Sequence, residues 1–420
     1  MSSQLAPAEE VASGSSTEGR TGRDDWRVIV AVFWITSMVE GLGVSQVFAF
    51  LPAYLSEMGV AESERLSFVG LFTALIFVVG APLVPLWGVW ADKYSRKAVI
   101  VRSCLVEAVV FACVALSREP WQLALSLLLI GFQLGNTGVM LAGIRDVAPE
   151  RRLGFVIAIF GAAGPIGFAV GPLLAGALID GLGWSLSGVF WLSALLSVFT
   201  AVLVGFGSRE VRPSVVPQGR VLSLAYGAVR GVVADPAVRR IFAIYFVTYL
   251  ANQLSRPYLP VIVEEVSGPG PGLASAIGFV TGTAALVGAV AATGGGALGD
   301  RLGFRPVLLG ALAGGGVALL LTPLAPVVLL LAITVMAFTA CNGTVGAMVF
   351  SLLATEVPAE RRSATLNLVY LPLYAAGIVG PIVGGVVAPM TGPAGPFVLG
   401  AIVFLAAAAV VALRIRRRAS

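Results

Sequence analysis

The chain has 420 residues, of which 58% are apolar and 12% charged, with a formal net charge of +5 and no histidine. Soluble globular proteins carry about 25% charged residues, so this composition excludes a disordered chain, a nucleic-acid binder and an ordinary soluble enzyme. The mean hydropathy of +0.95 and the 51 glycines instead predict a polytopic membrane protein with closely packed helices.

The chain opens with a polar head and continues as a series of apolar segments. We expect residues 1–26 to form a disordered tail, without a cleavable signal sequence. A membrane-spanning helix needs about 20 mostly apolar residues. Twelve spans are predicted on this basis: 28–56, 66–91, 98–117, 120–144, 153–179, 181–208, 241–263, 266–299, and two each within 306–355 and 363–413. The breaks inside the last two segments are expected at 322–326 and 391–393.

The lysines and arginines predict the topology. An even number of spans puts both termini on one side, and that side holds every basic residue except Arg65, Arg118 and Arg256. The positive-inside rule makes it the cytoplasmic side of a cell membrane. We therefore predict six-helix bundles over 27–207 and 241–414, a cytoplasmic linker over 208–240 and a basic tail over 415–420. The linker is weakly amphipathic, which leaves open whether it lies on the membrane surface or forms a solvated loop.

Three short patterns occur twice at almost the same offset. The pairs are 88–92 with 296–300, 171–176 with 380–385, and 146–152 with 356–362. Such internal repetition predicts two related halves, and it is typical of transporters in which one half moves against the other.

The segment Gly88-Val-Trp-Ala-Asp92-Lys-Tyr-Ser-Arg96-Lys97 resembles the signature loop of the major facilitator superfamily, between spans two and three. Its second copy runs from Gly296 to Arg305, and the resemblance covers about 27–414. It implies an all-α membrane protein with twelve transmembrane helices in two pseudo-symmetric six-helix bundles. It also implies that Asp92 docks on the start of span eleven and Asp300 on the start of span five, closing the cytoplasmic face in one state. Turn residues with topogenic charge are the alternative. The gating candidates are Gly88, Asp92, Arg96, Lys97, Gly296, Asp300, Arg301 and Arg305.

Span five resembles the Gly-Pro motif of exporters in this superfamily, above all the bacterial twelve-span drug:proton antiporters. Small residues and a proline permit close helix approach and a bend, and the resemblance implies that the partner is the other half. The motif residues are Gly167, Gly171, Pro172 and Gly176, with Gly380 and Pro381 in the second copy. Gly131 stands where that branch usually has a span-four arginine, so the arginine of the usual proton-coupling scheme is missing.

Three charges lie inside predicted spans, where each costs roughly 2.5–3.5 kcal/mol on insertion scales. In the superfamily, spans one and seven line the central cavity and span three is peripheral. Glu40 is therefore the best proton carrier, with a permanently neutral structural role as the alternative. Arg256 is expected to pair with Glu40 or to bind an anionic substrate group, unless it snorkels outward. Glu107 is expected to make a structural contact. Further polar candidates are Gln46, Asn136, Asn252, Gln253 and Asn342.

These patterns together predict a proton-driven secondary exporter of small amphipathic or drug-like molecules that works by alternating access. Its partners would be that substrate and the lipid bilayer, with no nucleic acid, and we expect a monomer. No cofactor or metal is expected, because histidine is absent and Cys104, Cys113 and Cys341 all lie within spans. The alternatives are a sugar or metabolite permease of the same fold and, from another class, a membrane enzyme or lipid scramblase. An enzyme is disfavoured because no nucleophile–base pattern is present.

Overall fold

The computed structural model describes residues 25–213, 216–356, 368 and 371–419. Throughout these residues the regular elements are helices. The predicted tail up to residue 24 and the second copy of the third repeat, beyond Glu356, lie outside the described residues. Ten stretches of the described residues are long and apolar enough to cross a membrane.

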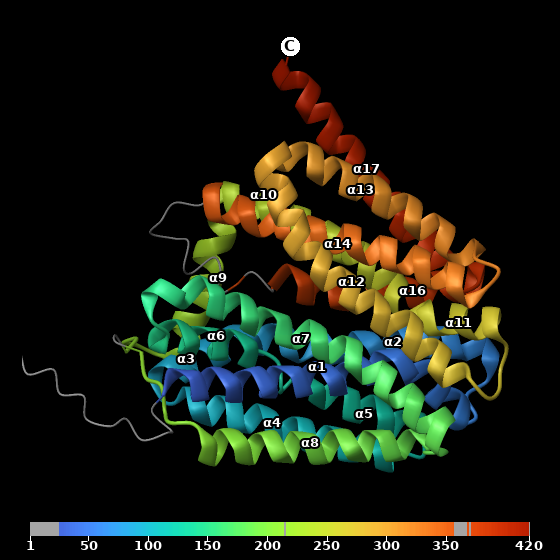
Figure 1. The fold of residues 1–420 in the computed structure, drawn as a ribbon, viewed down its shortest axis with the longest axis horizontal. Coiled ribbons are helices and arrows are strands. Elements are labelled where there is room, and N and C mark those ends of the chain that lie inside the picture. The colour runs from blue at the N-terminus through green and yellow to red at the C-terminus, as the bar shows by residue number, and fades with distance from the viewer. Residues whose placement is uncertain (1–24, 214–215, 357–367, 369–370, 420) are drawn as a thin grey trace, which may run out of the picture.

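The helices form two layers, one stacked on the other (Figure 1). The lower layer contains α1 (Trp26–Glu57), α2 (Glu62–Val78), α3 (Gly80–Lys93), α4 (Arg96–Leu116), α5 (Pro120–Ile130), α6 (Asn136–Val147), α7 (Leu153–Gly176) and α8 (Leu186–Gly207). After them come α9 (Val221–Ala234), α10 (Pro236–Ser255), α11 (Leu259–Ser267), α12 (Leu273–Leu302), α13 (Phe304–Leu321), α14 (Val328–Glu356), α16 (Leu371–Thr391) and α17 (Gly395–Ala419). We call α1–α8 the first half and α10–α17 the second half.

The breaks expected at 322–326 and 391–393 are confirmed, because α13 ends at Leu321 and α16 at Thr391. Two breaks were not foreseen. The predicted span 120–144 is divided between α5 and α6, and Gly135 makes the intervening turn with a φ of +102°, which an L side chain rarely adopts. The predicted span 241–263 is divided between α10 and α11 by a 3-10 turn over Arg256–Tyr258. Pro257 and Pro260 supply no N–H donor there, so the α-helix cannot continue unchanged.

The two halves touch at one end of the molecule. We call this the closed end; there α1 ends, α2 begins and α7 ends. At this end α7 packs on α12, and α16 packs on α2. A Cβ added to Gly278 would lie 2.4 Å from the Pro172 carbonyl oxygen, and one added to Gly70 would lie 2.4 Å from that of Pro381. Backbone thus meets backbone, which only glycine allows.

The Gly-Pro motif contacts the other half, as the resemblance implies, and it also packs within its own half. A Cβ on Gly167 would lie 2.0 Å from the Met38 carbonyl oxygen of α1, and one on Gly171 would lie 2.3 Å from that of Leu42. Two later residues of the motif reach the second half: the Pro172 carbonyl oxygen meets Gly278, and Gly176 meets the Ala274 carbonyl oxygen. Successive positions on a helix point in different directions, so one motif can serve two neighbours.

The second copy of the motif repeats this division of contacts. Gly380 packs on Gln253 of its own half, whereas the carbonyl oxygen of Pro381 meets Gly70 of the first half. The glycine of each Gly-Pro pair therefore packs within a half, and the proline carries the contact between halves.

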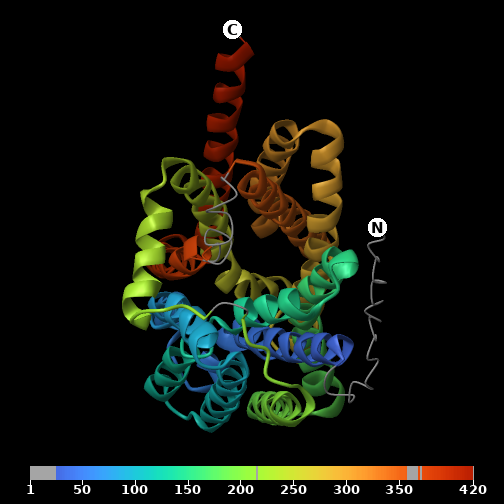
Figure 2. The same ribbon diagram turned by 90° about the vertical axis from the view of Figure 1, so that its left-hand side faces the viewer.

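The opposite end of the molecule, where α1 begins and α3 ends, is called the linker end. The linker forms the helix α9 there, and α9 lies beside α3 (Figure 2). The Tyr226 hydroxyl donates to the Pro82 carbonyl oxygen at 3.2 Å, and Lys93 Nζ donates to that of Gly219 at 2.6 Å. The linker is thus a helix docked on the first half. Its position relative to a membrane surface remains a prediction.

Candidate functional site

A cavity of about 600 Å³ lies between the two halves. The first half contributes Glu40 and Phe48 from α1, and α7 contributes Phe168. The second half contributes Tyr249 and Gln253 from α10, and Arg256 follows at the helix break. The structure therefore brings Glu40 and Arg256, which are far apart in the sequence, to a single cavity.

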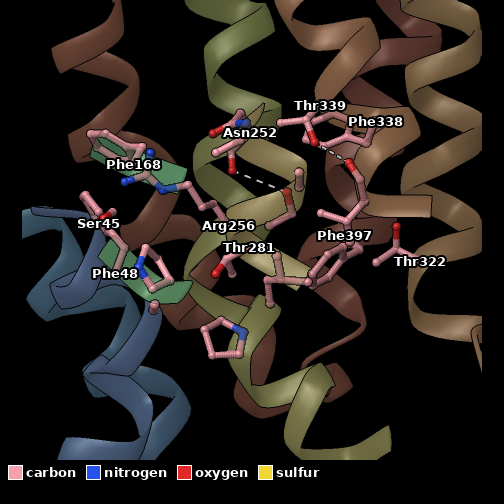
Figure 3. A pocket seen from close by; sticks show the side chains of 18 of the residues that line it. Ser45, Phe48, Phe168, Asn252, Arg256, Thr281, Thr322, Phe338, Thr339 and Phe397 are labelled. Carbon is pink, nitrogen blue, oxygen red and sulfur yellow. Dashed lines mark hydrogen bonds between the residues drawn. The ribbon is translucent and has the colours of Figure 1, made fainter. Parts of the chain in front are cut away.

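Arg256 enters this cavity between two aromatic rings. Its guanidinium carbon lies 3.6 Å from the centroid of the Phe48 ring and 5.6 Å from that of Phe168. Figure 3 shows the side chain reaching from the second half toward these two rings of the first half. Cation–π contacts of a desolvated arginine are worth about 2 kcal/mol, less than the cost of a charge inside a membrane.

The guanidinium keeps unused hydrogen-bonding capacity. Its Nη2 atom is buried without a hydrogen-bond partner. The ion pairs found among the described residues do not join Arg256 to Glu40, so the pairing expected from the sequence is not formed in this structure. Arg256 is therefore available to an anionic group of a bound molecule.

A second, smaller pocket of about 180 Å³ lies on the other side of Arg256. Phe48, Phe168 and Arg256 line both spaces, and Asn252 lines only the smaller one. Thr281 and Thr339 add hydroxyl groups from the second half (Figure 3). The two aromatic rings and the guanidinium thus form a partition between an apolar pocket and the larger cavity.

Glu40 faces the cavity beside the break in the fourth span. The side chain of Asn136 interacts with its carboxyl group, while its Oε2 atom has no hydrogen-bond partner. Asn136 is the first residue of α6, and the N-terminal end of a helix favours nearby negative charge. The break therefore places the positive end of a helix beside the Glu40 carboxyl group. It does so in the same span in which Gly131 stands at the place of the arginine expected from the resemblance.

Glu107 is more deeply buried within the first half than a position on a peripheral span suggests. Glu107 is 3% exposed, and its carboxyl group lies close enough to Glu40 for their charges to interact. The Oε1 atom of Glu107 has no hydrogen-bond partner. The sequence did not predict that the two glutamates interact, because Glu107 belongs to a span expected at the periphery.

Of the five other polar candidates, only Gln253 lines the larger cavity, and the residues outside its lining are Gln46, Asn136, Asn252 and Asn342. Gln46 is fully buried; its Nε2 donates to the Gly171 carbonyl oxygen at 3.3 Å, and its Oε1 accepts from Ser193 at 2.6 Å. These bonds join α1 to α7 and α8, so Gln46 serves helix packing. Asn342 of α14 has a buried Oδ1 without a partner and is not among the cavity-lining residues.

The signature loop is held to the other helices of the first half by hydrogen bonds. Arg96 is 5% exposed; its Nε donates to Asp92 at 2.8 Å and its Nη1 donates to Asp146 at 2.6 Å. Lys97 Nζ donates to the Ser208 carbonyl oxygen at 2.8 Å. These contacts hold the linker-end termini of α3, α4, α6 and α8 together.

Asp92 accepts a hydrogen bond from Arg96, and its expected docking on the start of span eleven remains a prediction because that start falls largely outside the described residues. Asp92 and Gly88 line a pocket of about 290 Å³ at the linker end, which Leu368 and Tyr374 of the second half also line. Residues 369–370, at the start of that span, are outside the described part. In the second copy of the loop, Asp300, Arg301 and Arg305 are exposed, and open space surrounds Gly296. The halves meet at the closed end, which leaves a pocket between them here.

Comparison with known families decides the identity of this fold. The model of the Major Facilitator Superfamily matches residues 33–273 and 241–420. The chain belongs to the Major Facilitator Superfamily. It is accordingly a multi-pass membrane transporter, and the resemblance first carried by the signature loop is confirmed.

Curated relatives extend over most of the chain. Multidrug resistance protein MdtG of Rahnella sp. (strain Y9602) is 26% identical over 399 residues, which are 94% of this chain and 95% of that protein. The protein of the same name from Salmonella typhimurium (strain LT2) is 29% identical over 293 residues, 69% of this chain and 70% of its own length.

Solved structures agree in fold. A bacterial homologue of the human lysosomal transporter Spinster, in an inward-facing and occupied conformation, superposes with a TM-score of 0.78 at 15% identity, covering 95% of this chain and 98% of that one. The nucleoside transporter NupG gives a TM-score of 0.71 at 15% identity, with coverages of 92% and 98%. Identities this low support a shared fold and carry no information on the substrate.

Proposed function

We propose that this transporter exports small amphipathic or drug-like molecules in exchange for protons. The observation that carries the proposal is the cavity between the halves, in which one carboxyl group, Glu40, shares an otherwise mainly apolar and aromatic wall with Arg256. The multidrug resistance proteins that resemble the chain over most of its length support the same substrate class. The positive-inside rule supports a cytoplasmic linker end. The transporter acts as a monomer, without a cofactor and without catalysing a reaction.

The packing of the two halves supports an inward-facing state. The closed end is sealed by glycine contacts, while pocket space between the halves remains at the linker end beside Asp92 and Tyr374. A substrate would enter from the cytoplasmic side and place its apolar surface against Phe48 and Phe168. Its binding would release the proton of Glu40 to the cytoplasm. Reprotonation from the opposite side would follow release of the substrate.

A test uses inside-out vesicles with an imposed pH gradient. Tetraphenylphosphonium, a lipophilic cation, and a panel of neutral drugs are added, and the substrate-induced proton leak is recorded. We expect a leak for wild type and a loss of at least about tenfold for Glu40→Gln, because a neutral amide cannot carry the proton. Glu57→Gln, at the exposed end of the same helix, is the matched control and should retain the leak. Transport against a gradient by folded Glu40→Gln would contradict the proposal.

A permease for anionic metabolites, working in either direction, is the second candidate. The unpartnered Nη2 atom of Arg256 favours it, since a carboxylate or phosphate would satisfy this donor. If no compound produces a proton leak, this second candidate becomes the favoured function. Uptake of labelled anionic metabolites should then be lost in Arg256→Gln and retained in Glu40→Gln.

A further inference from the structure

Glu40 and Glu107 occupy equivalent positions on two helices that run in the same direction. Both α1 and α4 begin at the linker end and come very close at Gly43, where an added Cβ would lie 2.3 Å from the Phe111 ring. Glu40 precedes Gly43 by three residues, and Glu107 precedes Phe111 by four. Residues three and four apart share a helix face, so both glutamates lie one turn from this contact, on the facing sides of the helices.

The break in the fourth span covers the two carboxyl groups. Gln133, within the break, is 1% exposed, and neither its Oε1 nor its Nε2 has a hydrogen-bond partner. Ser103 of α4 donates to the Gln133 carbonyl oxygen at 2.6 Å, one helical turn before Glu107. Asn136 interacts with Glu40 from this side. The amides and both glutamates therefore form a single buried cluster, in which Glu40, Glu107 and Gln133 retain unpartnered atoms.

Neutral groups dominate the surroundings of the pair. The α8 helix contributes Ser197 and Thr200, and α4 contributes the Cys104 thiol. Across the cavity lie Tyr249 and Arg256. Arg102 is the basic residue of α4 nearest in sequence to Glu107. It stacks on Trp87, with its guanidinium carbon 3.6 Å from the ring centroid. Within the described part of the chain, the ion pairs do not include either glutamate.

Two carboxylates without a paired cation cannot both be ionised cheaply in a low-dielectric site. We infer that Glu107 is the second carboxyl of the proton site, and that Glu40 and Glu107 hold one exchangeable proton between them beneath the break in the fourth span. The inference deepens the proposed function and rests on it. A single proton lets the neutral carboxyl donate to the ionised one, and the N-terminal end of α6 stabilises the remaining negative charge. Glu40 faces the cavity, so the shared proton enters and leaves the pair through Glu40.

The test is a pH titration of the protonated-carboxyl infrared band of the purified, full-length transporter, without substrate. Glu107→Gln removes the neighbouring negative charge, so Glu40 should lose its proton more easily. We expect the midpoint to fall by about one pH unit, tenfold in proton affinity. Cys104→Ala is the control, because this residue is buried in the same helix but holds no proton of the pair; its midpoint should match wild type.

An unchanged midpoint in folded Glu107→Gln would overturn the inference. If that variant does not fold, Glu107→Asp, which shortens the reach of the carboxyl, should also move the midpoint, and a wild-type value there would overturn it equally. The proposed function fails separately, if wild-type vesicles show no proton leak with any compound while the titration still shifts. If the proton leak requires Glu40 but the titration midpoint is unchanged in Glu107→Gln, only the inference that Glu40 and Glu107 share a proton is refuted.

Discussion

At the scale of single residues, Gly70 decides how closely the halves approach. A Cβ at this position would lie 2.4 Å from the Pro381 carbonyl oxygen and 2.5 Å from the Tyr258 hydroxyl. Gly70→Ala should therefore disfavour this state by about 1–3 kcal/mol, the usual cost of overpacking. Distances between spin labels on the ends of α2 and α16 should show a larger fraction of molecules separated at the closed end.

The control for this residue is a helical glycine with free space around it. Gly310 of α13 is exposed, and an added Cβ would meet no other atom within 4 Å. Gly310→Ala should leave the distance distribution unchanged. Equal distributions for Gly70→Ala and wild type would show that the contact does not limit closure.

At the scale of elements, the break between α5 and α6 is held by one left-handed residue. Gly135 has a φ of +102°, where an L side chain costs about 1–2 kcal/mol. Gly135→Ala should lower the thermal unfolding temperature in detergent. Because the turn also presents Asn136 to Glu40, this variant should weaken the substrate-induced proton leak.

A neighbouring glycine separates backbone strain from the effect of an added methyl group. Gly138 lies in α6 itself, and an added Cβ there would find open space. Gly138→Ala should keep or raise the unfolding temperature, since alanine favours the helix. A Gly135→Ala protein as stable as Gly138→Ala would contradict the assigned role of the left-handed turn.

At the scale of the whole molecule, polar contacts between the halves reinforce the closed end. Arg65 of α2 pairs with Glu264 of α11, with Nη1 and Oε2 3.1 Å apart, and their side chains are 10% and 25% exposed. Asp180, after α7, accepts a hydrogen bond at 2.6 Å from the Ser275 backbone N–H at the start of α12. Both contacts must break before this end can open.

Removal of the ion pair should shift the balance between the two states. Glu264→Gln should reduce the ratio of closed to open molecules at this end by roughly fivefold, since partly exposed pairs contribute about 1 kcal/mol. The same spin-label distances measure this ratio. The adjacent, exposed Glu265 provides the matched control as Glu265→Gln, and equal shifts in both variants would argue against the pair.

Local patterns identify much of this protein. Long apolar runs, the distribution of arginines and the repeated signature loop predict a two-half transporter, because each depends on neighbouring residues only. The charges at Glu40 and Arg256 stand out for the same reason, since a charged side chain inside a span is costly wherever it occurs. Family resemblance then indicates which spans face the cavity.

Contacts between segments that are distant in the sequence could be identified only from the tertiary structure. The sequence by itself determined the superfamily, the apolar segments and the candidate cavity charges. Only the fold decided that Glu107 lies on the side of α4 that faces Glu40, that Phe168 joins Phe48 around Arg256, and that the fourth span breaks at Gly135. The rotation of each helix about its axis sets these contacts, and it depends on packing against neighbours that lie far away in the chain.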